Sequence, residues 1–245
     1  MNILSLLQDN HISIVNGKIH IPESIKHVKL DVGLSYGAPM SQQWLSKEDD
    51  LMVFGFEPNP EAVNLIRSPT NCKKHESHGD VLEYKYVNKQ CFILPVALSA
   101  QTEESKPFYI TTLDEGCSSF YKPSGVLFDI SNVIQVPVIT LADFLSYFPW
   151  DTIPYIEYMK IDAQGADLDI LRGAGDYLEK IVFITAESSV GNLYLDVKDN
   201  DVNKVDEYMK EQGFFRILHP NTGDPTYINY RYRDIAPSIF IYQQG

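Results

Sequence analysis

Apolar residues fall into short, nearly continuous runs along the chain, and most runs are followed by a stretch with helical spacing. Runs of this kind are typical of strands in a parallel sheet, which helices cover on both faces. The runs that we interpret as strands cover residues 27–33, 51–57, 90–99, 155–161, 181–188, 214–220 and 237–245. Because strand and helix alternate, the pattern predicts one doubly wound α/β domain.

Local signals mark where several helices begin and end. Pro39 follows the first strand and suits the first position of a helix. Thr140, with Asp143 three residues later, matches a capping box. Residues 166–180 are predicted to form one helix, and Gly213 is placed to end a later one.

The first 27 residues precede the alternating pattern. They predict a short helix over residues 3–8 and a hairpin that turns at Asn16 and Gly17. We interpret residues 1–27 as a cap or edge on a main domain that spans residues 28–245. A lid over the ligand is the alternative.

Residues 99–140 interrupt the alternation of strand and helix. Short β-prone segments separated by turn residues, residues 118–124 among them, predict a β-rich insert within the domain. Near the C-terminus, the polar and aromatic residues 221–236 are expected to link the last two strands.

Composition and charge exclude several classes of function. The 245 residues carry a net charge of −13, which disfavours nucleic acid and anionic membranes as partners. The three cysteines lie far apart with no CxxC pair, so a disulfide framework or zinc site is not expected. We find no signal peptide and no membrane-spanning run, which favours a cytoplasmic protein.

The strongest chemical motif lies at the end of the first strand. Gly33 and Gly37 flank a loop that lets a ligand approach main-chain N–H groups, and Asp31 comes just before it. Twenty residues after Gly37, Glu57 ends the second strand, where a carboxylate can accept hydrogen bonds from both hydroxyls of a ribose. A plain strand-to-helix turn and a solvated carboxylate are the alternatives.

The loop indicates which nucleotide would bind. Dinucleotide folds use GxGxxG, and residues 34–36 of this loop lack the middle glycine. S-adenosylmethionine has no pyrophosphate and carries an ammonium group, which Asp31 is placed to approach. Further candidates for cofactor contacts are Ser35, Tyr36, Pro58, Asn59, Asp80 and Ala97, with His78 near Asp80.

The chain resembles the FkbM family of methyltransferases. The similar pieces are KLDVGLSYG, VFGFEPNP, LPVALSAQ, VPVITLADFL, YMKIDAQGADLDILRGAG and IVFITAES, in the order of the family and over residues 28–190. The resemblance implies a seven-stranded class I methyltransferase sheet whose last strand is antiparallel. It also implies S-adenosylmethionine and, most often, a hydroxyl acceptor on a sugar or natural product.

The resemblance also implies roles for individual residues. The loop with Asp31, Gly33 and Gly37, together with Glu57, would contact the cofactor, and Asp162 would face the transferred methyl group. One departure concerns Gln164, which stands where many relatives have glutamate.

Ligands of open α/β sheets bind beyond the carboxyl ends of the strands. That rule brings together Asp162, Gln164, Glu187 and His219. Asp162, Glu187 and His219 are candidates for the base that accepts the hydroxyl proton. Purely structural roles are the alternatives, such as a helix cap for Asp162.

Two further groups bear on the same chemistry. Lys160 lies two residues before Asp162, on the same side of the strand, and can lower the pKa of a carboxylate there. Asp162 and Glu187 offer a possible Mg²⁺ site, although no spacing demands one.

Two clusters are expected to shape the acceptor pocket. Ser118, Ser119, Phe120 and Tyr121 form a polar and aromatic patch suited to a sugar ring. The linker holds a second cluster of aromatic and basic residues: Tyr227, Tyr230, Arg231, Tyr232 and Arg233. Arg231 and Arg233 can grip the phosphate of a nucleotide sugar, or form a solvated surface pair.

The sequence therefore predicts an S-adenosylmethionine-dependent O-methyltransferase that acts on a sugar, a glycan or a nucleotide sugar. An NAD-linked sugar-nucleotide oxidoreductase is one rival, but it needs GxGxxG and a Tyr-x-x-x-Lys pair, and the chain has neither. A non-catalytic module that binds a nucleotide or glycan is the other. The oligomeric state has no signal in the sequence.

Overall fold

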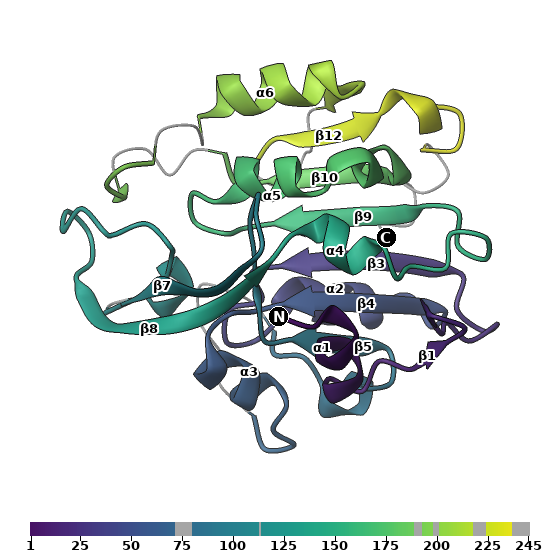
Figure 1. Cartoon of the computed structure of the whole chain (residues 1–245), viewed down its shortest axis with the longest axis horizontal. Coiled ribbons are helices and arrows are strands. Elements are labelled where there is room, and N and C mark those ends of the chain that lie inside the picture. The colour runs from purple at the N-terminus through teal and green to yellow at the C-terminus, as the bar shows by residue number, and fades with distance from the viewer. Residues whose placement is uncertain (72–79, 113, 189–192, 198–200, 218–223, 237–245) are drawn as a thin grey trace.

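A twisted sheet forms the centre of the molecule (Figure 1). The computed structural model describes residues 1–71, 80–112, 114–188, 193–197, 201–217 and 224–236. Within them the strand order is β11-β12-β10-β9-β3-β4-β5. The strands are β3 (His27–Val32), β4 (Leu51–Phe56), β5 (Cys91–Leu94), β9 (Ile156–Ile161), β10 (Ile181–Ala186), β11 (Phe214–Ile217) and β12 (Thr226–Asn229).

The pairing confirms the predicted α/β sheet. From β5 through β4, β3 and β9 to β10, all neighbours pair in parallel. β12 runs antiparallel to both β10 and β11. β4 and β10 are buried at every position, as expected for strands that are covered on both faces.

Helices cover both faces of the sheet. They are α1 (Ile3–Asp9), α2 (Pro39–Leu45), α3 (Pro60–Ile66), α4 (Leu141–Leu145), α5 (Asp167–Gly173) and α6 (Val202–Glu211). Side chains of α1, α4, α5 and α6 join one apolar cluster, whereas those of α2 and α3 join a second cluster. Among the described residues, no helix has the length and apolar character needed to cross a bilayer.

Several local predictions are confirmed. Pro39 occupies the first turn of α2, and Thr140 and Asp143 form the capping box of α4. The N-terminal hairpin pairs β1 (Ile14–Val15) with β2 (Lys18–Ile19) around Asn16 and Gly17. The single helix predicted over residues 166–180 is wrong, because α5 ends at Gly173 and a 3₁₀ helix (Gly175–Lys180) follows.

The predicted insert forms a small sheet of its own. β8 (Ile130–Ile139) pairs with β6 (Ala97–Leu98) and with β7 (Glu103–Thr111), in the order β6-β8-β7. Figure 1 shows β7 and β8 beyond the carboxyl ends of β3 and β9. The strand predicted at residues 118–124 is wrong, since only two isolated bridges form there, from Ser119 to Tyr109 and from Pro123 to Tyr194.

The C-terminal region differs most from the prediction. Residues 226–229, which were interpreted as part of a linker, form β12, and a 3₁₀ helix (Tyr230–Tyr232) follows. Thr, Tyr and Ile favour strands, but the polar and aromatic flanks of this short segment concealed that signal. The strand expected at residues 237–245 lies outside the described residues.

Candidate active site

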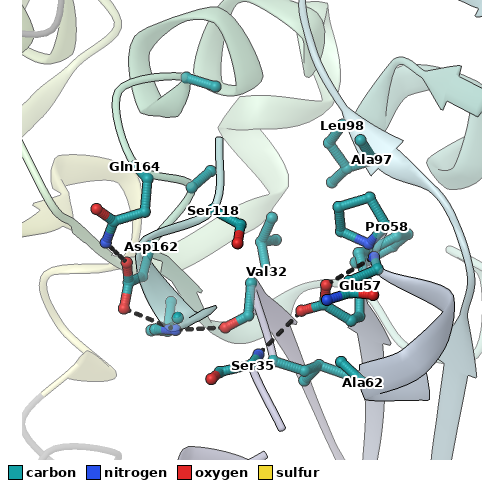
Figure 2. A pocket seen from close by; sticks show the side chains of 18 of the residues that line it. Val32, Ser35, Glu57, Pro58, Ala62, Ala97, Leu98, Ser118, Asp162 and Gln164 are labelled. Carbon is teal, nitrogen blue, oxygen red and sulfur yellow. Dashed lines mark hydrogen bonds and ion pairs between the residues drawn. The ribbon is translucent and has the colours of Figure 1, made fainter. Parts of the chain in front are cut away.

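A cavity of about 330 Å³ opens at the carboxyl ends of β3, β4, β9 and β10 (Figure 2). Its walls combine the loop after β3, residues 56–59 at the end of β4, and Lys160 with residues 162–164 at the end of β9. Residues 116–118 of the insert border it too. This is the place where ligands of open parallel sheets bind.

The loop after β3 folds closely against the end of β9. Gly33 has a φ of +80°, and a Cβ on it would lie 1.9 Å from the main-chain oxygen of Asp162. Only glycine fits there. Ser35 and Tyr36 follow it in the cavity wall, whereas Gly37 does not line the cavity.

Glu57 lies at the end of β4 with 5% of its surface exposed. The Ser35 N–H donates to its Oε2 at 2.9 Å, and the Asn59 N–H donates to its Oε1 at 2.8 Å (Figure 2). Burial raises the pKa of Glu57 to about 7, although these N–H groups oppose the shift. Each oxygen keeps a lone pair for a further donor, so the carboxyl can still receive a pair of hydroxyls.

The residues around Glu57 complete this end of the cavity. Pro58, Asn59 and Ala97 line it, and the Asn59 Nδ2 donates to the Tyr36 hydroxyl at 2.9 Å. Asp80 is exposed and is absent from the lining, and His78 lies outside the described residues.

The structure places Asp31 behind the loop and away from the cavity lining. Its Oδ2 accepts hydrogen bonds from the Ser41 N–H at 3.1 Å and the Ser41 hydroxyl at 2.6 Å. Burial raises the pKa of this carboxyl. Asp31 thus joins β3 to α2, and the expectation that it faces the ligand does not agree with this geometry.

Lys160 links the loop to the acids at the end of β9. Its Nζ donates to the Gly33 carbonyl at 2.8 Å and lies 3.4 Å from Asp162 Oδ2. It also lies 3.8 Å from Asp31 Oδ1. Burial would lower the pKa of Lys160, but the charges of Asp162 and Asp31 raise it, so the lysine stays protonated.

Asp162, after β9, lines the other end of the cavity, and Glu187, after β10, contacts Asp162 and Gln164 but does not itself belong to the lining. Burial opposes ionisation of Asp162, but the Lys160 charge and the hydrogen bonds from Glu187, Gln164 and Lys160 together outweigh it and lower the pKa of that carboxyl. Burial and the charge of Asp162 raise the pKa of Glu187 to about 10. At neutral pH the pair therefore holds one negative charge, on Asp162, and one proton, on Glu187.

The same geometry does not suit a magnesium ion. The Gln164 Nε2 donates to Asp162 Oδ1 at 2.8 Å and to Glu187 Oε2 at 2.7 Å. N–H donors and a protonated acid thus lie where a hard cation needs oxygen ligands. The part of the chain that the structure describes holds no group of three His, Cys, Asp or Glu arranged for a metal.

The insert brings only some of its predicted residues to the cavity. Ser118 and Phe120 line it. Ser119 is buried beside it and donates to the main-chain oxygen of Gln164 at 2.7 Å. The Tyr121 hydroxyl turns toward Asp169, at 3.4 Å, and lies outside the lining.

Residues 230–233 of the C-terminal cluster lie at the opposite end of the sheet from the cavity, where the parallel strands begin. Tyr227 lies on β12, and Asn229, just before residues 230–233 of the cluster, donates to the main-chain oxygen of Ile181, the first residue of β10. Arg231 makes two contacts with Glu179, at 2.8 and 3.2 Å, and Arg233 lies over the ring of Tyr230. The expectation that these residues hold a phosphate in the cavity is therefore not met. His219 lies outside the described residues.

Sequence reasoning missed three polar residues of the lining. Tyr158 and Thr185 share a hydrogen bond between β9 and β10, and Asp224 lies just before β12. Burial and the charge of Asp162 raise the pKa of Asp224. The two-residue period of a strand places Tyr158 on the side of Lys160, but Asp224 gave no signal within its apparent linker.

Comparison with known families agrees with this geometry. The model of the FkbM methyltransferase domain matches residues 38–215, from α2 to β11. Searches of curated proteins and of solved structures find no match. Because the family match covers more than half of the chain, the protein belongs to the FkbM methyltransferase family.

Proposed function

We propose that this methyltransferase uses S-adenosylmethionine and transfers the methyl group to a hydroxyl of an uncharged sugar or glycan. The observation that carries the proposal is the pairing of two carboxyls in one cavity. Glu57 lies at one end with its lone pairs available, and ionised Asp162 lies at the other.

The end of the cavity around Glu57 fits the cofactor. Glu57 would accept hydrogen bonds from the two ribose hydroxyls. Gly33 allows close approach to the main chain, and the apolar surfaces of Pro58, Ala97 and Leu98 suit an adenine ring. When bound, S-adenosylmethionine supplies an electrophilic methyl group on a sulfonium.

The end of the cavity around Asp162 fits the acceptor hydroxyl. A hydroxyl is a weak nucleophile until a base accepts its proton, and a positioned base contributes about 10²–10⁴-fold to the rate. Asp162 is ionised at neutral pH, and its side chain is 40% exposed where it lines the cavity. Glu187 is protonated and is therefore not the base in this arrangement.

The charges around the acceptor favour an uncharged sugar over a nucleotide sugar. Asp162 and Asp224 both line the cavity, and Lys160 is the only lysine or arginine among the described lining residues. That lysine is already bonded to Gly33 and Asp162. A phosphate would meet excess negative charge, whereas sugar hydroxyls can bond to Ser118 and Thr185.

Calorimetric titration with S-adenosylmethionine and S-adenosylhomocysteine tests the cofactor. We expect micromolar binding of both and no comparable binding of NAD. The affinity should be about 10- to 150-fold lower in Glu57→Gln, because the amide keeps only one of the two acceptor oxygens and leaves a ribose hydroxyl without its partner. Glu61→Gln, on the exposed side of α3, is the matched control and should bind normally. Tight binding of NAD, or no effect of Glu57→Gln, would contradict the proposal.

A further inference from the structure

Gln164 joins two carboxyl groups at the reacting end of the cavity. Its Nε2 lies 2.8 Å from Asp162 Oδ1 and 2.7 Å from Glu187 Oε2. An amide nitrogen has two hydrogens, so each carboxyl can receive one. The opposite orientation would place the amide oxygen against the ionised carboxylate of Asp162, and therefore the amide nitrogen faces Asp162 (Figure 2).

The protein itself holds Gln164 in this position. The Tyr194 hydroxyl lies 2.8 Å from its Oε1 and 2.5 Å from the main-chain oxygen of Cys117, so its single proton is shared between these two acceptors. The Ser119 hydroxyl donates to the main-chain oxygen of Gln164 at 2.7 Å. The backbone of Gln164 has a φ of +52°, in the left-handed region that non-glycine residues seldom adopt. Such a conformation persists where surrounding contacts over-determine it, so the amide is in place before any ligand binds.

The charges near the pair come from several elements, and all of them affect how it titrates. The groups that face it are Lys160 on β9, Asp31 on β3, Asp167 on α5 and Asp224 before β12, with the neutral thiol of Cys117 and hydroxyl of Tyr194. Lys160 is the only cation in this set. Because it lies beside Asp162, it favours the charge there and leaves the proton with Glu187.

We propose that Gln164 is a positioning residue: its two N–H groups hold Asp162 and Glu187 together, and the one donated to Asp162 keeps that carboxylate ionised and oriented to accept the proton of the acceptor. This inference rests on the methyl transfer proposed above. In that step the O–H bond of the acceptor breaks as the O–CH₃ bond forms, and Asp162 takes the proton. The electron pair of the C–S bond remains on sulfur. Tyr194 acts one contact further out, because it fixes the amide.

Two variants test this role. Gln164→Glu keeps the shape but replaces the N–H donor with a third acid, and Tyr194→Phe removes only the hydroxyl that holds the amide. Both should raise the pKa of Asp162 and move the acidic limb of the kcat profile to higher pH. At neutral pH we expect kcat to fall about 10- to 100-fold in Gln164→Glu and less in Tyr194→Phe. The acceptor KM should change by less than about threefold.

A second measurement does not depend on activity. Carboxyl ¹³C NMR of the protein without ligand should show one carboxyl that stays protonated at neutral pH and is lost in Glu187→Gln. It should also show the Asp162 signal titrating at higher pH in Tyr194→Phe than in wild type. Tyr155→Phe, at the other edge of the sheet, is the matched control and should leave both signals unchanged.

The outcomes separate this inference from the proposed function. A raised acceptor KM with an unchanged pH profile would make Gln164 an acceptor contact and overturn the positioning role. Unchanged carboxyl titrations in both variants would overturn it as well. If the titrations shift as expected but no methyl transfer occurs with any hydroxylated acceptor, the proposed function fails while the positioning role of Gln164 stands.

Discussion

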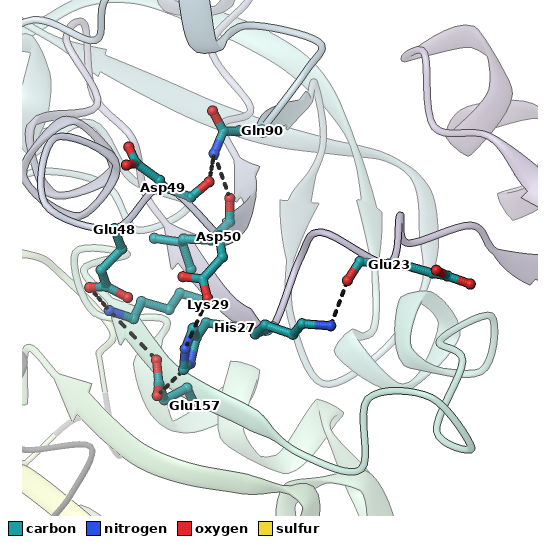
Figure 3. A network of polar contacts seen from close by, with 10 residues as sticks. Glu23, His27, Lys29, Glu48, Asp49, Asp50, Gln90 and Glu157 are labelled. Carbon is teal, nitrogen blue, oxygen red and sulfur yellow. Dashed lines mark hydrogen bonds and ion pairs between the residues drawn. The ribbon is translucent and has the colours of Figure 1, made fainter.

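The parallel strands of the central sheet carry a lysine between carboxylates near each of their ends, which we call the amino edge, where the strands begin, and the carboxyl edge, where they end. Near the amino edge, Lys29 Nζ lies 2.5 Å from Glu48 Oε1 and 3.7 Å from Glu157 Oε2 (Figure 3). At the carboxyl edge, Lys160 Nζ lies 3.4 Å from Asp162 and 3.8 Å from Asp31. The residue types are alike, but the surroundings of the two lysines differ.

In the cluster around Lys29, the charged side chains pair with one another. Lys29 is fully buried, and Glu157, 5% exposed, also contacts His27 Nδ1 at 3.0 Å. At the other edge, Asp162 is 40% exposed to a cavity and pairs with the protonated Glu187. Where every charge has a partner, the cluster stabilises the fold, and where one charge faces a cavity, it becomes available for chemistry.

The sharpest way to test this difference is to neutralise one acid at each edge. Asp162→Asn should lower kcat about 10²–10⁴-fold, because the base is lost, while the affinity for S-adenosylmethionine stays close to that of wild type. Glu157→Gln should leave kcat of the folded protein nearly unchanged. Steady-state kinetics and calorimetry on both variants provide the check. Equal losses of kcat in the two variants would contradict the distinction.

The two lysines give the next largest effect. Lys29→Met leaves Glu157 buried with a weaker partner and should lower the free energy of unfolding by about 3 kcal/mol, without changing the cofactor affinity. Lys160→Met should lower both stability and activity, because it also releases the Gly33 carbonyl. Urea denaturation measures the free energy of unfolding, calorimetry measures the affinity for S-adenosylmethionine, and steady-state kinetics measures the activity.

A matched control for the lysines lies at the same edge. Lys26 is exposed, and its Nζ donates to the main-chain oxygen of Glu23 at 2.6 Å. Lys26→Met should therefore stay within about 0.5 kcal/mol of wild type. A similar loss in Lys26→Met and Lys29→Met would mean that burial of the ion pair is not the cause.

Much of the fold follows from the sequence because burial leaves a periodic signal. The runs that became β4 and β10 are almost entirely apolar, those that became β3 and β9 carry charged residues among apolar ones, and the capping box at Thr140 is a local pattern. β12 has only four residues between polar flanks, so its pairing with β10 depends on tertiary context that periodicity does not record.

The candidate site was predictable where a residue follows a strong strand. Gly33, Glu57 and Asp162 were found in this way, and all three line the cavity. Contacts between segments that are far apart in the chain leave no pattern in the sequence. Asp31 was expected at the cavity, but its hydrogen bonds to Ser41 turn it toward α2.

Arg231 was expected to bind a phosphate for a similar reason. A dense basic cluster looks the same in sequence whether its charges are free or paired, and only the fold shows its ion pair with Glu179. The roles of Gln164 and Tyr194 likewise depend on a hydrogen bond between segments 30 residues apart.

The smallest effect concerns the pH dependence of stability at the amino edge. A hydrogen bond with Glu157 raises the pKa of His27 above 6.5, against the opposing effect of burial, and the charge of Asp50 adds to the shift. The protonated form is therefore favoured by folding. Its contribution is fully present below about pH 6.5 and is lost as the pH rises through the folded-state pKa.

His27→Gln should remove this contribution and leave the rest of the fold in place. Since the ring is 34% exposed, we expect a difference from wild type of about 0.5–1 kcal/mol near pH 6 that vanishes near pH 9. Wild type itself also loses stability as the pH rises, because burial raises the pKa of Glu57 and Asp167 to about 7. Only the difference between the two proteins, from urea titrations at each pH, isolates the histidine. A difference that grows with pH would show that His27 folds in its neutral form, and the amino edge would then lack the extra cation that distinguishes it from the carboxyl edge.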